Sequence, residues 1–394
     1  MRQLPIDDQA RGTVQLRLLN TRRVLTALRQ AGGPARIAEL ATMTNLTRPT
    51  VTQIVSALEG RTLQRYEPAG AAGRPAARYG LAKEAFVVFG ADAGAHRAVV
   101  EIASLDGTAR ARRERRRTPP LGADMLELLV ELGRECLEEL ELPPTAVIAG
   151  TVASPGIVEQ PTGRITLRAG LGGWDGAQVV SVLSRHFTGE ITVENDANLA
   201  AQAMCAVPDM PRTFLGLQWG QRLGAGIVLD GRIYRGQLGA AGELGSLLVP
   251  DPVTGEIRHL EEVSHAGRLP LLGGTPDLST EELIGAAADG DARSTRALRR
   301  GVDVLAAAVA PTCLALDLHT VAISGAIARS GPALTTAFRE SLAERGAVGI
   351  DCRLSPFHED TVLRGAVGHA IDAGWERLIE QAGPQASMAA TEVS

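Results

Sequence analysis

The chain has 394 residues, of which 45% are hydrophobic and 22% are charged, and its formal net charge is −5. Its size exceeds one ordinary domain, and its composition is typical of a globular protein rather than a disordered or fibrous one. No apolar run is long enough to span a membrane, and the N-terminal MRQLPIDDQARG lacks the pattern of a signal peptide, so we expect a cytoplasmic protein.

Cysteine spacing and charge distribution further limit the kinds of protein and of binding site that this sequence can form. Cys136, Cys205, Cys313 and Cys352 form no CxxC or CxC pair. This argues against a disulfide framework or a cysteine zinc site, and we expect buried free thiols. Residues 1–85 carry thirteen Arg and Lys against six Asp and Glu, a net charge of +7 that leaves −12 for the rest. A basic N-terminal region on an acidic body predicts that only this region meets a polyanion.

The N-terminal region begins with predicted helices. Residues 15–29 carry apolar side chains at helical spacing, namely Leu16, Leu19, Val24, Leu25 and Leu28. The AGGP stretch at 31–34 predicts the end of this helix. A short second helix is expected over residues 36–41, with Ile37, Leu40 and Ala41 on its inner face.

A third helix follows a tight turn. Asn45 tolerates the left-handed conformation that such a turn needs, and Thr47 can cap the next helix, with Pro49 in its first turn. The apolar face of that helix comprises Val51, Ile54, Val55 and Leu58. Two helices joined in this way form a helix-turn-helix, in which the start of the second helix enters the major groove of DNA. A generic helical bundle with solvated polar faces is the alternative interpretation.

After Gly60, the sequence TLQRYEPAGAAGRPAARYGL predicts the hairpin wing of a winged helix. The GRP tripeptide at 73–75 resembles an arm that reaches a narrow minor groove, although an ordinary linker explains it nearly as well. The predicted DNA-contacting side chains are Arg36, Thr47, Arg48, Thr50, Thr52, Gln53 and Arg74.

From Phe86 the pattern changes to short strands. FVVFGADAG, RAVVEIAS and LDGTARARRERRR predict three strands, with a hairpin turn at Leu105-Asp106-Gly107. We interpret the basic run at 110–117 as an exposed strand face rather than a nucleic-acid patch, because the winged helix already supplies a DNA reader. A helix at 125–140, a strand at 146–151 and a strand and helix at 191–206 follow.

The predicted order of strands and helices then begins again. RTFLGLQWG, GAGIVLD and GRIYRG predict strands, the last two joined by Asp230-Gly231, and helices and a strand at 320–325 follow. The order βββαβα thus occurs twice. Two such lobes around a cleft form the ribonuclease H-like arrangement of actin and sugar kinases. The last helix, within GAVGHAIDAGWERLIEQ, is expected to pack back onto the first lobe.

The predicted fold class is therefore α/β, with an N-terminal winged helix-turn-helix before a two-lobed ribonuclease H-like body. The predicted boundaries are a head with its linker at 1–84, a body at 85–382 and a disordered tail at 383–394. Within the body they are lobe one at about 85–200 plus a C-terminal helix at about 363–382, and lobe two at about 201–350.

One stretch of the body, ITVENDANLAAQ, places polar residues where a strand ends and a helix begins. Asn195 and Asp196 follow a β-branched run directly, and small helix formers come next. Ligand and catalytic groups collect at the carboxyl ends of strands in α/β folds. Asp196 is therefore a candidate acid, either for catalysis or for ligand binding.

Several motifs together resemble the ROK family (repressor, open reading frame, kinase) over residues 16–382. They are LRLLNTRRVLTAL, GRPAARYGL, GADAG, SPGIV, ENDANLAA, GAGIVLDGRIYRG and GAAGELGS. The family contains sugar kinases without a DNA-binding domain and sugar-responsive transcription factors with one. The resemblance implies that Asn195, Asp196 and Glu243 bind sugar hydroxyls, and Glu261 falls where the family has a glutamate.

The chain departs from the family's nucleotide-binding elements. The first phosphate loop, Asp-x-Gly-Gly-Thr-Lys in kinases, reads DAGAHR at 92–97, and the second, Gly-Thr-Gly-Ile-Gly, reads GQRLG at 220–224. The adenosine-side Gly-Gly-Gly reads SGA at 324–326. Such loops work because backbone N–H groups approach phosphate closely, so added side chains make ATP binding unfavourable. The alternative is that Arg97 and Arg222 bind phosphate themselves.

The family's zinc and sugar elements are also altered. The zinc region contains no cysteine, and His259 and His265 alone do not make a tetrahedral site, so no metal or other cofactor is expected. Ser246 replaces a histidine of the sugar pocket, and Gly170 lies where an asparagine is usual. Since sites built to bind a hydroxyl discriminate strongly, the effector should differ from the one glucose-type members prefer, or bind weakly.

These features predict a sugar-responsive transcriptional regulator, a repressor, that is not an enzyme. Its expected partners are a double-stranded DNA operator, a sugar or sugar-derivative effector and further copies of the chain in a homodimer or homotetramer, with no membrane. One alternative is an ATP-dependent sugar kinase that carries a DNA-binding head and uses Asp196 as general base. Another is a regulator whose sugar pocket has decayed.

Overall fold

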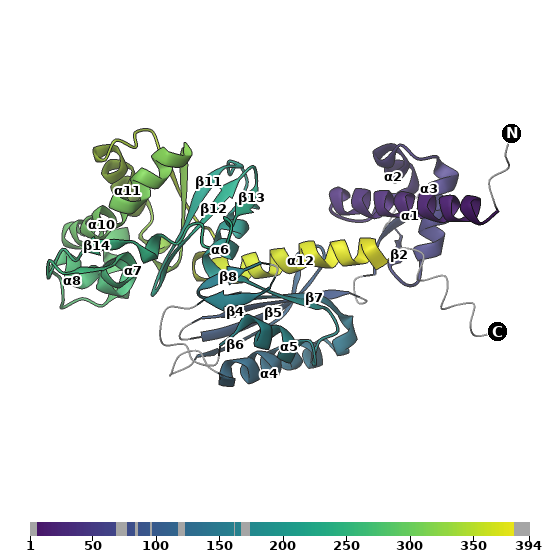
Figure 1. The fold of residues 1–394 in the computed structure, drawn as a ribbon, viewed down its shortest axis with the longest axis horizontal. Helices are drawn as coiled ribbons and strands as arrows, with labels where there is room; N and C mark the ends of the chain where they lie inside the picture. The colour runs from purple at the N-terminus through teal and green to yellow at the C-terminus, as the bar shows by residue number, and fades with distance from the viewer. Residues whose placement is uncertain are drawn as a thin grey trace.

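The computed structural model describes residues 6–67, 77–82, 86–94, 97–116, 123–160, 162–166 and 174–381. A small N-terminal head lies beside a larger body with two lobes (Figure 1). This arrangement confirms the predicted fold class, a winged helix-turn-helix followed by a two-lobed α/β body. In the described part of the chain, no helix is both long enough and apolar enough to cross a membrane.

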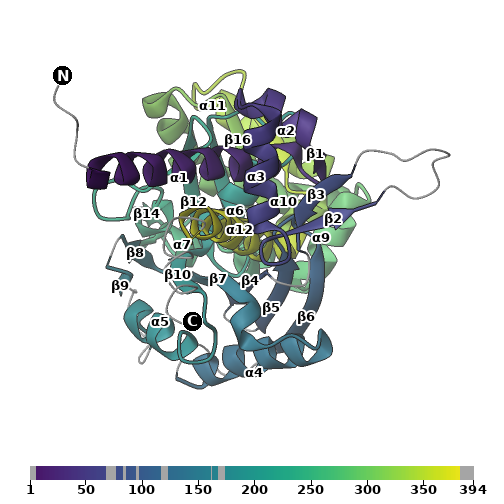
Figure 2. The same ribbon diagram turned by 90° about the vertical axis from the view of Figure 1, so that its right-hand side faces the viewer.

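The head contains three helices and a small sheet of order β1-β3-β2. Its elements are α1 (Ile6–Ala31), β1 (Ala35–Arg36), α2 (Ile37–Thr44), α3 (Arg48–Leu58), β2 (Leu63–Tyr66) and β3 (Arg78–Leu81). Leu16 and Leu19, which share the predicted helical spacing with Val24, Leu25 and Leu28, are 59% and 53% exposed, whereas those three are buried. The N-terminal half of α1 extends past α2 and α3 (Figure 2).

The turn between α2 and α3 has the left-handed residue and the helix cap that the sequence predicts. Asn45 has φ +55°, and the Thr47 hydroxyl accepts a hydrogen bond from the Thr50 backbone N–H at 3.3 Å. Val51 and Val55 are buried against the rest of the head. Local caps and one apolar face therefore account for the helix-turn-helix.

The first lobe is built on a five-stranded sheet of order β10-β7-β4-β5-β6. Its strands are β4 (Val87–Ala93), β5 (Arg97–Ser104), β6 (Ala109–Arg116), β7 (Val147–Ser154) and β10 (Glu190–Asn195). Strands β10, β7 and β4 run parallel, and β4, β5 and β6 form an antiparallel meander. Helices α4 (Ala123–Glu139) and α5 (Gly176–Leu183) cover one face, and α12 (Thr361–Gln381) lies on the other (Figure 1).

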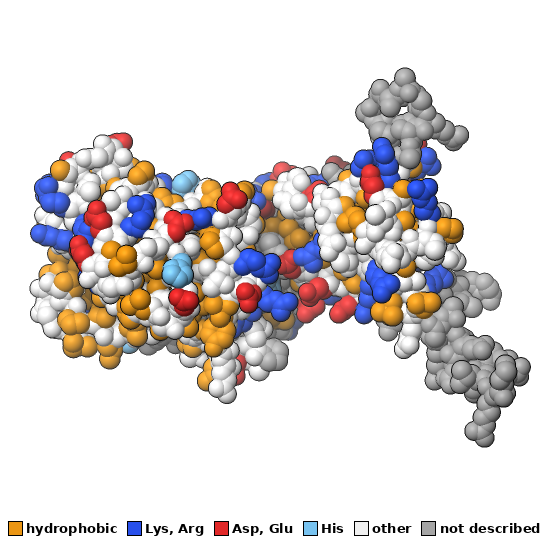
Figure 3. Space-filling view, turned by 90° about the horizontal axis from the view of Figure 1, so that it is seen from above, with side chains coloured by type: hydrophobic (Ala, Val, Ile, Leu, Met, Phe, Trp, Pro, Cys, Tyr) orange, Lys and Arg blue, Asp and Glu red, His pale blue; other side chains and the backbone are white. Residues whose placement is uncertain are grey.

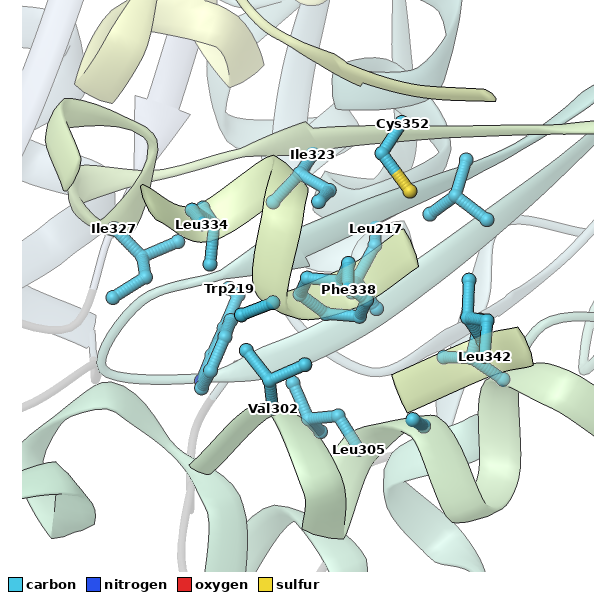
Figure 4. Packing of buried hydrophobic residues seen from close by; sticks show 14 of the residues in the cluster. Leu217, Trp219, Val302, Leu305, Ile323, Ile327, Leu334, Phe338, Leu342 and Cys352 are labelled. Carbon is cyan, nitrogen blue, oxygen red and sulfur yellow. The ribbon is translucent and has the colours of Figure 1, made fainter. Parts of the chain in front are cut away.

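The second lobe repeats this arrangement in the order β13-β12-β11-β16-β17. Its strands are β11 (Phe214–Trp219), β12 (Leu223–Leu229), β13 (Arg232–Tyr234), β16 (Thr320–Ser324) and β17 (Asp351–Leu354). The predicted turn at Asp230-Gly231 is confirmed by positive φ at both residues. The core packs the sheet against α10 (Ala292–Leu316) and α11 (Pro332–Glu344), with the Trp219 and Phe338 ring centroids 5.9 Å apart and edge to face (Figure 4).

The remaining elements are short additions to these two lobes. They are β8 (Ile157–Glu159), β9 (Arg164–Thr166), β14 (Leu248–Pro250), β15 (Ile257–His259), α7 (Leu260–Ser264), α8 (Leu269–Gly273), α9 (Thr280–Ala288) and the 3-10 turns η1 (Pro144–Ala146), η2 (Leu244–Ser246), η3 (Ala266–Arg268), η4 (Ala326–Ser330) and η5 (His358–Asp360).

Helices α6 (Asp196–Met204) and α12 join the lobes. Glycines on β11 and β12 let α6 approach closely, because a Cβ at Gly216 or Gly224 would lie 2.5–2.6 Å from an alanine Cβ of α6. On its other side, α6 contacts α12, where a Cβ at Gly365 would collide with the Leu199 carbonyl. From there α12 runs along β4 and β7 and reaches α1, which confirms the prediction that the last helix packs onto the first lobe.

Candidate functional site

Polar side chains gather at one edge of the first sheet. Because β10, β7 and β4 are parallel, their carboxyl ends meet at this edge. Asn195 pairs with Ser154 across β10 and β7, and Asp92 pairs with Ala153 across β4 and β7. Asp196 begins α6 immediately after β10. The strand-end position inferred for Asp196 from the sequence is therefore correct.

Asn195 holds the backbone of this edge together. Its side-chain Oδ1 accepts a hydrogen bond from the Asn198 N–H at 2.9 Å, and its Nδ2 donates one to the Gly156 carbonyl at 2.9 Å. The side chain is only 7% exposed. Asn195 thus caps α6 and ties it to the SPG turn, which leaves one lone pair of Oδ1 for a ligand.

Asp196 lies in a charged and partly buried position. Burial raises the pKa of its carboxyl to about 6, the positive charge of Arg222 opposes this shift, and the negative charge of Glu261 adds to it. Arg222 stands in the turn between β11 and β12, and Glu261 stands on α7. Residues of both lobes therefore surround Asp196, and near neutral pH its carboxyl is largely an acceptor for hydrogen bonds.

The second lobe supplies the other predicted sugar contacts. The Oε1 of Glu261 accepts a hydrogen bond from the Leu223 N–H at 3.4 Å. Glu243 precedes η2, and a Cβ at Gly245 in η2 would lie 3.3 Å from the Glu261 Cβ. Glu261 thus lies near Asp196. The η2 turn that follows Glu243 lies against the same β11–β12 hairpin.

The first phosphate loop is occupied by ion pairs. The Arg97 guanidinium donates to the Glu359 carbonyl at 2.7 Å and to the Asp360 carboxylate at 3.3 Å. It also lies 3.8 Å from Asp92 and 3.7 Å from Glu114. Ala95 and His96 of this loop lie outside the described residues. Arg97 is therefore already engaged by carboxylates and a backbone carbonyl of the protein, which argues against the alternative that it binds phosphate itself.

Arg112 extends this cluster. Its guanidinium donates to both carboxylate oxygens of Asp360, at 2.7 and 2.9 Å. Burial raises the pKa of Asp92 to about 7, against the attraction of Arg97. Glu114 and Asp360 together offset the charges of the two guanidiniums, so this cluster offers a triphosphate little net attraction.

Asp92 should make stability depend on pH. Its pKa of about 7 in the folded state exceeds the ordinary value of 3.8, so the folded protein binds a proton that the unfolded chain releases between these values. The free energy of unfolding should therefore fall as pH rises through this window, by at most about 1.4 kcal/mol per pH unit for this group. Denaturant unfolding at pH 5, 6.5 and 8 should show a flatter profile for Asp92→Asn. The exposed Asp209→Asn serves as control, and parallel profiles for Asp92→Asn and the wild type would contradict the prediction.

The other two nucleotide elements are packed against protein. Leu223 of the second phosphate loop is buried, and a Cβ at Gly224 would clash with Ala197. In the adenosine-side element, Gly325 has φ +95°, and a Cβ there would collide with the Trp219 carbonyl. Gly224 and Gly325 therefore serve close packing between elements, whereas a Cβ at Gly220 would meet no heavy atom within 4 Å.

One ion pair between the lobes, whose carboxylate is buried, is not predicted by any pattern in the sequence. Glu194 of β10 is 1% exposed and pairs with Arg235, which follows β13 of the other lobe, at 2.6 Å. Its carboxylate also accepts hydrogen bonds from the Asn195 N–H and the Asn198 Nδ2 at 2.9 and 3.1 Å. The only signal in the sequence is an acidic residue inside a buried β-branched run.

The predicted DNA-contacting residues lie on the head. Among them, Arg36, Thr47, Arg48, Thr52 and Gln53 are exposed, Thr50 is partly buried and bonded to Thr47 at 2.8 Å, and Arg74 lies outside the described residues. Basic side chains are distributed over the visible face of the head (Figure 3). The start of α3 thus presents an arginine, a hydroxyl and an amide to solvent.

The basic run of the body lies on the edge strand β6, as predicted, but Arg110, Arg112 and Arg113 are half-buried, and Arg117 lies outside the described residues. Arg113 pairs with Glu139 at 2.6 Å and Arg115 pairs with Glu135 at 2.8 Å, both on α4. These arginines are therefore neutralised within the body.

The histidines of the former zinc region have separate surroundings. His259 Nδ1 lies 3.0 Å from the Ser246 carbonyl, and burial lowers the pKa of His265. The described ranges contain no group of three or more His, Cys, Asp or Glu side chains that could hold a metal ion. Gly170, named for the sugar pocket, lies outside these ranges.

Comparisons with known proteins agree with both parts of the chain. The model of the ROK family matches residues 88–368, and that of the IclR helix-turn-helix domain matches residues 18–66. The chain is 28% identical over 123 residues to the xylose repressor of Caldicellulosiruptor bescii, which covers 31% of each protein. It is 38% identical over 95 residues to the N-acetyl-D-glucosamine kinase of Haemophilus influenzae, covering 24% of this chain and 31% of that one. The chain thus matches about a third of the length of these two relatives.

Solved structures share the fold. A ROK family transcriptional regulator, a homolog of the E. coli MLC protein, has a TM-score of 0.73 and 18% identity over 93% of this chain and 98% of its own. A ROK family glucokinase from Streptomyces griseus, solved with glucose and AMPPNP, has a TM-score of 0.62 and 18% identity over 73% of this chain and 99% of its own. The match to the regulator covers enough of this chain to include the head. The match to the glucokinase covers a share equal to that of the body alone.

Proposed function

The chain belongs to the ROK family, and from this premise we propose that it is a sugar-responsive transcriptional repressor rather than a sugar kinase. In this proposal residues 1–84 form the operator-binding head and residues 85–382 form the sensor. The observation that carries it is one chain with an exposed DNA-reading helix and a body whose nucleotide-side arginine, Arg97, is already paired.

The proposed effector is a sugar or sugar derivative bound between the lobes. Asp196 comes from the junction of β10 and α6, and Glu243 and Glu261 come from the second lobe, while Asn195 caps the start of α6. A ligand that bridges these groups favours the closed arrangement of the lobes and shifts the population toward it. The names of the relatives suggest a first panel of D-xylose, D-glucose and N-acetyl-D-glucosamine.

Removing the charge of Asp196 should weaken sugar binding. An ionised carboxylate accepts hydrogen bonds from hydroxyls, and losing one charge-assisted bond costs about 1.5–3 kcal/mol, or roughly 10- to 100-fold in affinity. We expect a panel sugar to raise the melting temperature of the wild type and to raise that of Asp196→Asn far less. Affinity should also fall as pH drops below about 6, the pKa of Asp196. The Asp209→Asn control should behave as the wild type, and an unchanged response of Asp196→Asn would reject this site.

The kinase alternative makes an opposite prediction. With Mg-ATP and each panel sugar, the proposed regulator should release no sugar-dependent ADP. Sugar-dependent release that Asp196→Asn abolishes would replace the regulator proposal with a kinase that carries a DNA-binding head.

Repressors of this architecture act as dimers on two-fold operators, and we propose a homodimer here. Exposed apolar side chains on the second lobe support self-association, and they are Tyr234, Leu238, Leu247, Leu248, Val253 and Ile257. A mobility shift and footprint on the DNA upstream of its own gene test the proposal. Two protected half-sites about one helical turn or a multiple of it apart are expected. Binding without sequence selectivity would reject the regulator, and a single protected half-site would reject the dimer.

A further inference from the structure

A cavity of about 260 Å³ lies between the head and the body, and none of the residues proposed to bind sugar lines it. The head contributes Leu28 and Gly33 near the end of α1 and Tyr66 at the end of β2. The body contributes Phe86 before β4 and Ile371 and Trp375 of α12. Domain interfaces are common places for small-molecule sites, so this cavity is a candidate.

Three aromatic side chains are among the residues that line this cavity. The chain has only three Trp, three Tyr and six Phe, yet one of each lines it. The Tyr66 hydroxyl donates to the Leu81 carbonyl at 2.9 Å, and the Trp375 Nε1 donates to the Leu105 carbonyl at 3.2 Å. Because these polar atoms are bonded to the backbone, the rings offer a ligand their apolar faces and edges.

The charged groups at the edge of the cavity already have partners within the protein. Arg29 lines the cavity and pairs with Asp372 of α12. Asp106 lines it from the turn between β5 and β6, and its carboxylate accepts a hydrogen bond from the Thr108 N–H at 3.0 Å. Neither group is an unpaired counter-charge for a charged ligand. An uncharged ligand is therefore favoured.

The volume limits the size of the ligand. A dry apolar cavity of about 150 Å³ is enough for one benzene ring. A cavity of 260 Å³ has room for two fused rings. We propose that this cavity binds a small uncharged aromatic molecule of one or two rings, stacked against Tyr66, Phe86 and Trp375.

Such a ligand would join the head to the body. Its contacts would bridge α1 and β2 on one side and α12 on the other, so occupancy would restrict the orientation of the head. Binding itself does not depend on the proposed function, whereas an effect on operator affinity rests on it.

Titration of the full chain with indole by isothermal calorimetry tests the proposal. We expect one indole per chain, with a dissociation constant of about 1 mM or tighter, and at least tenfold weaker binding of cyclohexanol. No saturable binding of indole would overturn the proposal. Equal binding of cyclohexanol would overturn the aromatic class of the ligand.

Two variants locate the site. A Cβ at Gly33 would meet no heavy atom within 4 Å, so Gly33→Phe has room to place a ring beside the cavity. We expect it to weaken indole binding at least tenfold and to leave the sugar-induced thermal shift unchanged. Gly285→Phe, at an equally open position on α9, should bind indole as the wild type does. Phe86→Leu provides a second test, since it keeps an apolar wall but removes one ring. Wild-type affinity in both Gly33→Phe and Phe86→Leu would overturn the assignment.

Discussion

Replacing Arg48 and Gln53 together by alanine should lower operator affinity by about 10- to 100-fold or more. Both side chains are exposed on α3, Arg48 at its first residue and Gln53 five residues later, and the start of this helix is the part of a helix-turn-helix that enters the major groove. A base contact contributes about 1–3 kcal/mol of discrimination, and loss of a phosphate contact reduces the salt dependence by about one ion. Mobility shifts at several salt concentrations separate the two kinds of contact. The melting temperature should hardly change, because neither side chain is buried.

The control for this prediction is Arg185→Ala, which removes an exposed arginine from the body. It should leave both the affinity and its salt dependence unchanged. A loss of affinity equal to that of the double variant would mean that overall charge, rather than the start of α3, governs DNA binding. Wild-type affinity of the double variant would exclude α3 as the recognition helix.

Replacing Arg235 by alanine should destabilise the body by about 3–5 kcal/mol, because it leaves the Glu194 charge buried without its partner. Glu194 keeps hydrogen bonds from Asn195 and Asn198, but these do not neutralise it. Denaturant unfolding measures the loss. Since the pair joins the two lobes, the unfolding of the body should also become less cooperative.

A second substitution tests this explanation. Glu194→Gln in the Arg235→Ala background removes the uncompensated charge, so it should recover part of the lost stability. Arg258→Ala breaks an exposed ion pair with Glu256 and should leave stability nearly unchanged. If the double variant is less stable than Arg235→Ala alone, burial of an unpaired charge is not the cause.

The parts of the fold that the sequence predicts well depend on local chemistry. The helix-turn-helix followed from a left-handed Asn45 and a capping Thr47, and the hairpin of the second lobe followed from Asp230-Gly231. The start of α1 at Ile6 was not predicted, because the apolar spacing in the sequence begins only at Leu16. Strand β17 was missed because four residues are too few to establish a periodicity.

The candidate site likewise has some features that follow from local sequence and others that do not. The place of Asp196 follows from a strand that ends and a helix that begins, and both signals lie within a few residues. The partners of Arg97 and Glu194 lie 263 and 41 positions away, at Asp360 and Arg235. Only the tertiary fold brings such residues together, so no local pattern could identify these pairs.

Because α12 extends from the junction of the lobes to the head, a small rotation at the junction moves the far end of the helix by a larger distance. The helix has 21 residues and is therefore about 31 Å long, with its first turns against α6 at the junction of the lobes and its later turns against the head. A turn of the first lobe by about 10° against the second would carry the far end of this helix through about 5 Å. That distance exceeds one base-pair step of about 3.4 Å. In a dimer held through the second lobes, a modest closure around a ligand would thus move two recognition helices out of phase with successive grooves.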